Sequence, residues 1–495
     1  MVLSFRRKVA MFYRRFSDFI QPVSRNVSNH WSYYRYVLRR FSWSSFVKLL
    51  GGPIVTGISV YSLMWGDCKS GKLLDLALPL IGLIIGAFVS LYYGVKSFDD
   101  KYLYQEKDDD AYKNVEPPSG LPGWKKKTIR ILNGEGKVVE ESDIYTNDDI
   151  DQWLYDGAVG VRMERDRKYE KDLKKKIRAR FDDIYKPFLR HNYKKSLFYG
   201  RQFTNEKKWG ISQEFNCDTK TIRVHKTSYF DTYLTNIIPG SQLWSARYEK
   251  VMVQVNGEGF MPYIEQGGER HLLQLGHQST ANELGVTTLC FLGETGAIPL
   301  WRQTHQTQSS SGQLVATGSG SADWNDCDEF LKSDKSFHKA IVRGMERELW
   351  EEAVKSSRAV KKKDFYERTQ TKITGYFRWL SKGGKSEFVG VSQVDIERLL
   401  DKISAEESEV AQGKLIQSPT VFSLKEALGQ LVKQDSDKPD EYISHDCSIS
   451  CAVAILALHA VCERTVCAGC ALLDKCSGDV CKKQPTSVLF ATDAR

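Results

Sequence analysis

Residues 336–354, SFHKAIVRGMERELWEEAV, constrain how this chain can fold more than any other segment does. In an α-helix, side chains three and four positions apart lie on the same face. One face of this segment is apolar and should pack against a core; it comprises Phe337, Ile341 and Met345. The same face continues into Glu348 and Glu352. The sequence therefore predicts a partly buried helix with carboxylates at the end of its apolar face.

Glu348, Glu351 and Glu352 are predicted to point inward together from this helix. Converging carboxylates repel one another unless a cation lies among them, and a site of oxygen ligands suits Mg²⁺ or Mn²⁺. Arg347 is placed to pair with one of these glutamates and to fix its rotamer. The alternative interpretation is a solvated acidic patch on an amphipathic helix, which requires no ligand.

Residues 347–352, Arg-Glu-apolar-x-Glu-Glu, resemble the second half of the Nudix box, the metal-binding loop and helix of Nudix hydrolases. The first half departs from the family pattern, because Lys339 stands in place of the first box glutamate and Ser333 in place of the box glycine. Val354 and Lys355 replace the closing Gly-apolar pair. The resemblance therefore rests on half of the motif.

The resemblance implies a fold, a cofactor and an activity. The fold is an α/β/α sandwich with a mixed sheet, and the cofactor is Mg²⁺ or Mn²⁺ held by Glu348, Glu351 and Glu352. The activity is hydrolysis of a phosphoanhydride bond in a nucleotide-like small molecule, a nucleoside diphosphate linked to another group. Glu352 and Glu387 are the catalytic candidates, and Arg347 would orient the carboxylates.

Strands are expected on both sides of the helix. The β-branched and aromatic runs that predict them are residues 286–292, 297–302, 313–317, 373–380 and 387–391. A separate hairpin is predicted for residues 128–132 and 137–140, and a mixed-charge helix for residues 163–185.

Two uncharged apolar stretches near the N-terminus, residues 49–65 and 76–95, predict a transmembrane hairpin. The segment before them is rich in Lys and Arg, whereas their connection carries only Lys69 and Lys72. This bias places both termini in the cytosol. The partners expected from the hairpin are a lipid bilayer, through residues 49–95, and a second copy of the chain packed through the membrane helices. The alternative is a pair of buried core helices.

The departures from the Nudix box pattern and the predicted transmembrane hairpin together leave a second functional hypothesis open. A Nudix-fold module could bind a nucleotide-like signal and act through the hairpin without turnover. Glu329 is another candidate for a general base if turnover does occur. No nucleic-acid partner is expected, because the net charge of +9 is modest and acids interrupt the basic run at residues 174–176.

Cysteines gather near the C-terminus. Four of them offer thiolate ligands for a structural Zn²⁺: Cys467, Cys470, Cys476 and Cys481. Their spacing matches no familiar zinc motif, so the alternative is a tail of free thiols.

The domain plan expected from the sequence is a basic segment (1–45), two membrane helices (46–66 and 75–96), a linker (97–126), a hairpin and charged-helix connector (127–198), a Nudix-like domain with an N-terminal extension (199–460) and a Cys-rich tail (461–495).

Overall fold

The structure, a computed structural model, describes residues 28–37, 103–108, 110–199, 201, 203–257, 259–292, 297–304, 312–354, 360–395, 410–417, 420–471 and 485–490. It divides into two compact units. Unit 1 comprises Met1–Ala111, Lys174–Asn205 and Gly240–Asn256, and unit 2 comprises Tyr112–Leu173, Glu206–Pro239 and Gly257–Arg495. The predicted site residues that the structure describes all belong to unit 2.

Unit 1 contains a small antiparallel sheet and the helix α6 (Lys186–Phe198). In the sheet, β8 (Ser241–Ser245) lies between β1 (Leu103–Lys107) and β9 (Lys250–Val255). The helix over residues 28–37 packs its Tyr33 ring against the ring of Tyr193 in α6, with centroids 4.2 Å apart. Aromatic stacking of this kind supplies both apolar burial and a preferred ring geometry.

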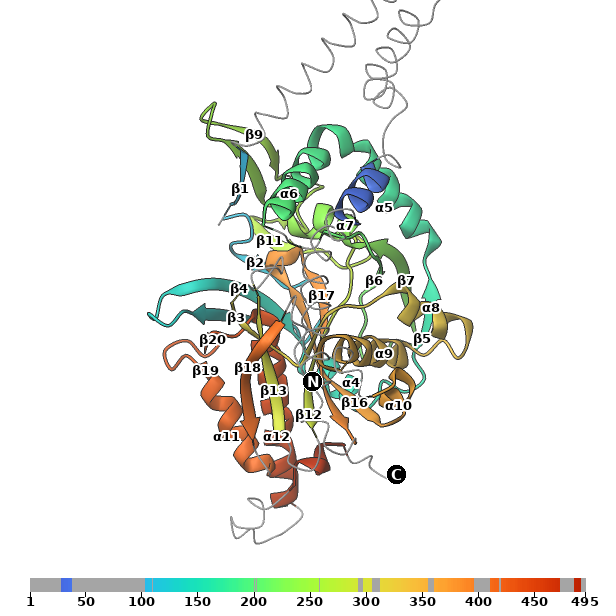
Figure 1. The fold of residues 1–495 in the computed structure, drawn as a ribbon, viewed down its shortest axis with the longest axis vertical. Helices are drawn as coiled ribbons and strands as arrows, with labels where there is room; N and C mark the ends of the chain where they lie inside the picture. Colours follow the sequence, from blue (N-terminus) through green and yellow to red (C-terminus); the bar gives the residue numbers. More distant parts are fainter. Residues whose placement is uncertain are drawn as a thin grey trace, which may run out of the picture. The chain divides into compact units, whose positions relative to one another are not determined.

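Unit 2 is built on a mixed sheet whose strands run in the order β14-β13-β12-β17-β16-β4-β3-β20-β19, with β15 pairing β12 and β18 pairing β13 (Figure 1). The pairs β12–β17 and β3–β20 are parallel. The strands are β3 (Lys125–Leu132), β4 (Val138–Thr146), β12 (Gly285–Leu292), β13 (Ala297–Gln303), β14 (Leu314–Val315), β15 (Gly318–Ser321), β16 (Thr369–Trp379), β17 (Lys385–Val394), β18 (Val410–Gln417), β19 (Val432–Gln434) and β20 (Glu441–His445).

Helices cover both faces of this sheet. On one face lie α4 (Asp148–Tyr155), α8 (Trp324–Lys332) and α9 (Phe337–Leu349), and on the other α11 (Val421–Leu431) and α12 (Ile449–Ala471). β17 shows why both faces are buried, since Phe388 packs with the α9 side and the next residue, Val389, packs with the α12 side.

Smaller elements complete unit 2. One further sheet has the order β5-β7-β6, with β5 (Arg162–Arg165), β7 (Thr221–Ser228) and β6 (Lys207–Ile211), and another has the order β10-β11-β2, with β10 (Tyr263–Gln266), β11 (Glu269–Leu272) and β2 (Val115–Glu116). Short helical segments are α7 (Tyr229–Thr232), η3 (Tyr233–Ile237), η4 (Trp350–Val354), α10 (Lys362–Glu367), η6 (Leu380–Lys382) and η8 (Thr486–Phe490). The charged helical stretch consists of α5 (Arg167–Ala179) and η2 (Phe181–Tyr185); α5 belongs to unit 2 up to Leu173, and the rest of the stretch belongs to unit 1.

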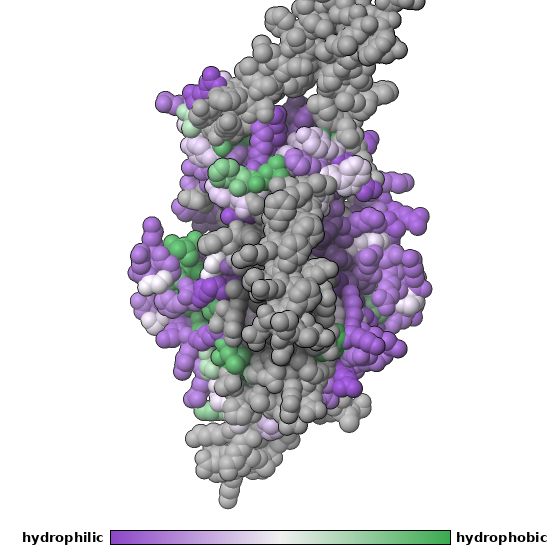
Figure 2. All heavy atoms as spheres, in the orientation of Figure 1, coloured by the Kyte–Doolittle hydropathy of each residue, from purple (hydrophilic) through white to green (hydrophobic). Residues whose placement is uncertain are grey.

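Figure 2 shows that the visible face of the described residues is mostly hydrophilic, with apolar residues in small patches. Near the tip of the β3–β4 hairpin, Val138 and Val139 are 44% and 55% exposed. Isolated apolar residues of this kind are ordinary on a protein surface.

The predicted transmembrane hairpin, with its location in a membrane and both termini in the cytosol, is the prediction that the structure overturns. In the part of the chain that the structure describes, no helix is both long and apolar enough to cross a bilayer. The 23-residue α12 packs apolar side chains such as Ile455 and Leu458 against the central sheet. The predicted spans, residues 46–66 and 75–96, lie outside the described residues. The fold class is therefore mixed α/β with several sheets.

Candidate functional site

The helix predicted for residues 336–354 is present as α9 followed by the π-helical turn η4. Ser336 caps its N-terminus by accepting a hydrogen bond from Lys339 N at 3.3 Å. The predicted apolar face is buried, with Phe337, Ile341 and Met345 in one core cluster. The prediction of an inward-facing amphipathic helix is confirmed.

Two glycines of β15 let the end of this helix lie directly on the strand. A Cβ at Gly318 would lie 2.7 Å from the backbone nitrogen of Leu349, and one at Gly320 would lie 2.4 Å from the carboxyl carbon of Glu348. Any side chain at either position would therefore collide with α9 or with Glu348. The glycine-serine run that precedes the helix in the sequence is thus a strand whose glycines allow close contact with α9.

Arg347 is the hub of a buried ion-pair network. Its guanidinium donates to Asp326 Oδ2 at 2.9 Å, to Glu348 Oε1 at 2.9 Å and to Glu351 Oε2 at 3.1 Å. It also donates to the carbonyl oxygen of Ser321 at 2.9 Å. The predicted pairing of Arg347 with one glutamate is confirmed, and the structure adds a second glutamate and an aspartate from α8.

Glu352 has a different partner. One of its carboxylate oxygens accepts a hydrogen bond from the backbone nitrogen of Ser319 at 2.8 Å. Glu348 lies against Gly320, the next residue of the same strand. Two of the three box carboxylates, Glu348 and Glu352, therefore converge on β15, while Glu351 is turned toward solvent with 36% of its side chain exposed.

The π-helical turn explains why the three glutamates do not form one row. The expected common face assumes about 100° of rotation per residue, which holds for an α-helix. Glu351 and Glu352 lie in η4, where the backbone closes i→i+5 hydrogen bonds and each turn is wider. Such single π turns inside α-helices are frequent at functional sites.

Lys208 brings a second buried cation to the network from β6. Its Nζ lies 2.7 Å from Asp323 Oδ1 and 2.8 Å from Glu206 Oε2. Asp323 also faces Arg347, with 3.7 Å between Oδ2 and Nε. The two cations therefore share one carboxylate, and both donate to the carbonyl oxygen of Ser321.

Burial shifts the protonation of these groups. It raises the pKa of Glu348 to about 7, although the neighbouring Arg347 and Lys208 lower that pKa. Burial also raises the pKa of Asp326, against the opposing effect of Arg347. Burial by itself lowers the pKa of Lys208, but the carboxylates of Glu206 and Asp323 outweigh it and raise that pKa. Lys208 is therefore charged at neutral pH.

Glu346, on the same helix, permits a test of these shifts. Burial raises its pKa from the ordinary value of 4.5 to about 7, with Arg343 opposing the shift. Between those values the folded protein keeps a proton that the unfolded chain has lost, so this group lowers stability as the pH rises. We expect Glu346→Gln to become more stable relative to wild type between about pH 5 and pH 8, by on the order of 2–3 kcal/mol.

Urea unfolding at the two pH values measures that difference. The matched control is Glu367→Gln, because the Glu367 side chain is 62% exposed and its replacement should show no comparable change with pH. A Glu346→Gln effect that is the same at both pH values would show that Glu346 ionises normally in the folded protein.

Glu387, the other catalytic candidate, does not join this group. It lies on β17 one residue before Phe388, which faces α9, so the Glu387 side chain points to the opposite face of the sheet. There its Oε1 accepts a hydrogen bond from Lys385 Nζ at 2.8 Å. A Cβ at Gly285, the register partner of Glu387, would lie 1.6 Å from Glu387 Oε2. Glu387 is thus a buried, internally paired carboxylate.

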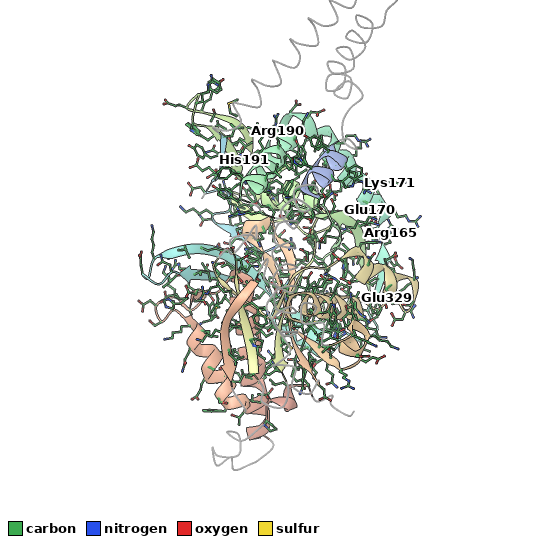
Figure 3. The ribbon with its side chains drawn as sticks, viewed as in Figure 1. Arg165, Glu170, Lys171, Arg190, His191 and Glu329 are labelled. Atoms are coloured by element: carbon green, nitrogen blue, oxygen red, sulfur yellow. The ribbon has the colours of Figure 1, made fainter. Side chains whose placement is uncertain are left out.

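The remaining predicted ligands are dispersed. Glu329 is exposed on α8 (Figure 3). Cys467 and Cys470 fall in α12, whereas Cys476 and Cys481 lie outside the described residues, so the predicted zinc site stays a prediction. Among the described residues, no group of three or more His, Cys, Asp or Glu side chains is arranged to hold a metal ion.

The donor set of Glu348 and Glu352 nevertheless fits Mg²⁺ in one respect. Mg²⁺ in proteins is commonly bound through only one or two carboxylates, with water and substrate phosphates as the other ligands. Glu348 and Glu352 supply two carboxylates at adjacent positions of β15, and Gly320 leaves the space in which Glu348 lies. The two residues therefore fit an ion that keeps most of its other ligands from solvent or substrate.

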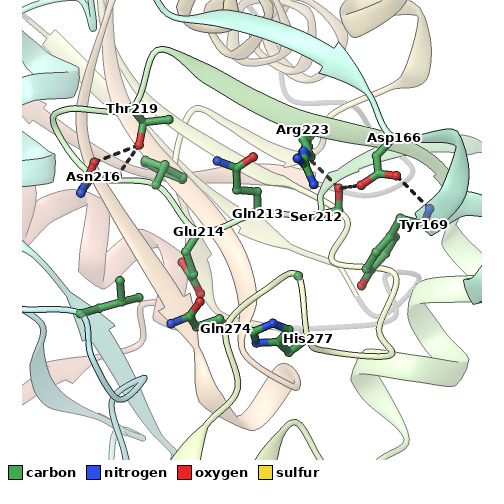
Figure 4. A pocket seen from close by; sticks show the side chains of 13 residues that line it. Asp166, Tyr169, Ser212, Gln213, Glu214, Asn216, Thr219, Arg223, Gln274 and His277 are labelled. Carbon is green, nitrogen blue, oxygen red and sulfur yellow. Dashed lines mark hydrogen bonds between the residues drawn. The ribbon is translucent and has the colours of Figure 1, made fainter.

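A separate polar pocket of about 460 Å³ lies in unit 2 away from these glutamates (Figure 4). Its wall includes Asp166, which accepts a hydrogen bond from Ser212 Oγ at 3.1 Å, and Glu214, which forms an ion pair with the buried Arg378. Arg223 and His277 also line it. None of the site residues predicted from the sequence lines this pocket, and no motif in the sequence indicated it.

The network residues that sequence reasoning missed are Lys208, Asp323 and Asp326. Asp323 and Asp326 had a local signal, since an acidic residue followed three positions later by another opens a helix, and Asp326 Oδ2 accepts from Asp323 N at 3.0 Å. Lys208 had no local sequence signal, because it lies far from the helix in the sequence.

No protein-family model matches the chain, and no curated protein sequence is significantly similar to it.

Proposed function

We propose that this protein is a Mg²⁺-dependent hydrolase that cleaves a phosphoanhydride bond in a nucleoside diphosphate linked to another group. The observation that carries the proposal is the convergence of Glu348 and Glu352 on the glycine strand β15, beside two buried cations. The substrate class rests on the resemblance of residues 347–352 to the Nudix box.

Residues of the chain would have separate roles in this reaction. Glu348 and Glu352 would hold the ion, and Arg347 would fix the rotamer of Glu348 through the bond at 2.9 Å. The bound ion would neutralise charge on the diphosphate and lower the pKa of the attacking water. Glu387 is assigned no role as a base, because its side chain lies on the other face of the sheet and is paired with Lys385.

The proposal predicts Mn²⁺ binding and Mg²⁺-dependent turnover by the full-length chain. Turnover of ADP-ribose and nucleoside diphosphate sugars should be followed by release of nucleoside monophosphate, and Mn²⁺ binding by its magnetic resonance signal. Glu352→Gln keeps the shape of the side chain and removes its charge, so we expect weaker Mn²⁺ binding and a loss of turnover of about 100-fold or more.

The matched control is Glu329→Gln, which changes the same residue type at an exposed position of α8. It should leave both Mn²⁺ binding and turnover as they are in wild type. Failure of the wild-type chain to bind Mn²⁺ at millimolar concentration would rule out the proposed function.

A second candidate function is binding of the nucleotide without turnover. Two observations favour it. Arg347 already neutralises Glu348 and Glu351, and the position of the first box glutamate is taken by Lys339, whose side chain is 61% exposed and paired with Asp334. Binding of ADP-ribose by both wild type and Glu352→Gln, with no product from either, would select this function over hydrolysis.

A further inference from the structure

We infer that Lys208 is a resident counter-ion beside the candidate site, and that its ammonium group opposes the binding of a divalent cation at Glu348 and Glu352. The inference rests on the proposed function in one respect, namely that Glu348 and its neighbours are where the cation binds. It adds that the affinity of the site for metal is set by a residue from outside the box.

The position of Lys208 is the first step of the argument. The residue is 6% exposed, and its Nζ lies within 2.8 Å of carboxylate oxygens from two different segments, Glu206 and Asp323. Burying a lysine is costly unless the charge is paired. A lysine held in this way functions as a bound cation, with a compact charge and three donors.

The second step is that Lys208 and the box glutamates belong to one electrostatic system. Lys208 and Arg347 share the carboxylate of Asp323 and both donate to the carbonyl oxygen of Ser321, and Arg347 in turn donates to Glu348 at 2.9 Å. A divalent cation beside Glu348 would therefore repel Lys208, and Lys208 would repel the cation. At short range in a partly buried site, this repulsion is weakly screened by salt.

The third step concerns which of the two cationic side chains, Arg347 or Lys208, can move away when a divalent cation binds. Arg347 is fixed by three carboxylates and a carbonyl, all within 3.1 Å. Lys208 is a flexible side chain, and one of its partners, Glu206, has 53% of its side chain exposed. Lys208 can therefore leave Asp323 and stay paired with Glu206 at the surface, whereas Arg347 has no such route.

The test is a titration of the full-length chain with Mn²⁺ alone, at fixed ionic strength and without nucleotide. We expect Lys208→Met and Lys208→Gln to bind Mn²⁺ about tenfold more tightly than wild type, since each removes a positive charge next to the site. Lys208→Arg keeps the charge and should bind Mn²⁺ as weakly as wild type. Lys207→Met is the matched control, because Lys207 is the exposed neighbour on β6 and its loss changes the net charge equally.

The outcomes separate this inference from the proposed function. If wild type, Lys208→Met and Lys208→Gln bind Mn²⁺ equally, the inference is wrong while the proposed function stands. If wild type does not bind Mn²⁺ but Lys208→Met or Lys208→Gln does, the inference stands and the proposed function falls. If none of them binds Mn²⁺, both are overturned. Lys208→Gln retains a donor for Asp323, so it provides the comparison if Lys208→Met does not fold.

Discussion

Arg347→Met is expected to lower the free energy of unfolding by about 3–5 kcal/mol, the cost of removing one partner from a buried ion pair. The guanidinium is the common partner of Asp326, Glu348 and Glu351. Methionine fills a similar volume but leaves Asp326 and Glu348 buried without their cation, and both carboxyls would then have to take up protons or water. Urea unfolding of the full-length chain at neutral pH measures the loss.

Lys339→Met is the control for Arg347→Met. Lys339 is on the same helix and is also ion-paired, but its side chain is 61% exposed and its partner Asp334 is at the surface. Surface pairs contribute about 0–1 kcal/mol, so this change should be small. If the two variants have similar stabilities, the network around Arg347 is solvated and does not hold the site together.

Gly320→Ala is expected to have the second large effect. Its new Cβ would fall 2.4 Å from the carboxyl carbon of Glu348, so the carboxylate must leave β15. Gly318→Ala is expected to be worse, because its Cβ would meet the backbone of Leu349 at 2.7 Å and a backbone cannot rotate away. Overpacking of this kind costs about 1–3 kcal/mol, and for Gly320→Ala the loss of Mn²⁺ affinity should exceed the loss of stability.

Gly344→Ala provides the contrast within the same helix. A Cβ at Gly344 would meet Ala322 Cβ at 3.5 Å and Val286 Cγ1 at 3.7 Å, which are ordinary contacts. Replacing a helix-interior glycine with alanine then stabilises by up to about 1 kcal/mol. Thermal unfolding of the three variants should rank Gly344→Ala highest and Gly318→Ala lowest, and any other order would contradict the close contact between α9 and β15.

Much of the local structure was predictable because it depends on short-range patterns. The β-branched run of β12 and the turn residues of the β16–β17 hairpin indicate strands without knowledge of their partners. The apolar spacing of Phe337, Ile341 and Met345 fixes which face of α9 is buried. The sequence did not predict the glycines of β15 as a strand, since their role as a strand depends on the helix that lies against them.

The site itself was predictable only in part. The pairing of Arg347 with Glu348 follows from adjacent residues, but the ion pair of Lys208 with Asp323 joins segments whose proximity only the fold establishes. Glu387 was assigned from the family resemblance, and the alternation of side chains along β17 places it on the wrong face for that role. The membrane prediction relied on the hydropathy of residues 46–96, and the described helices contain no span that supports it.

The parallel pairing of β3 with β20 places Thr128 beside Glu441, which has a consequence for biosynthesis. At roughly 5–20 residues per second, β3 leaves the ribosome about 15–60 s before β20 does. During that interval the β3–β4 hairpin has an open strand edge, and such edges pair with strands of other chains. The yield of folded protein should therefore depend on how many nascent chains are close together and on chaperones that cover this edge until the C-terminal strand arrives.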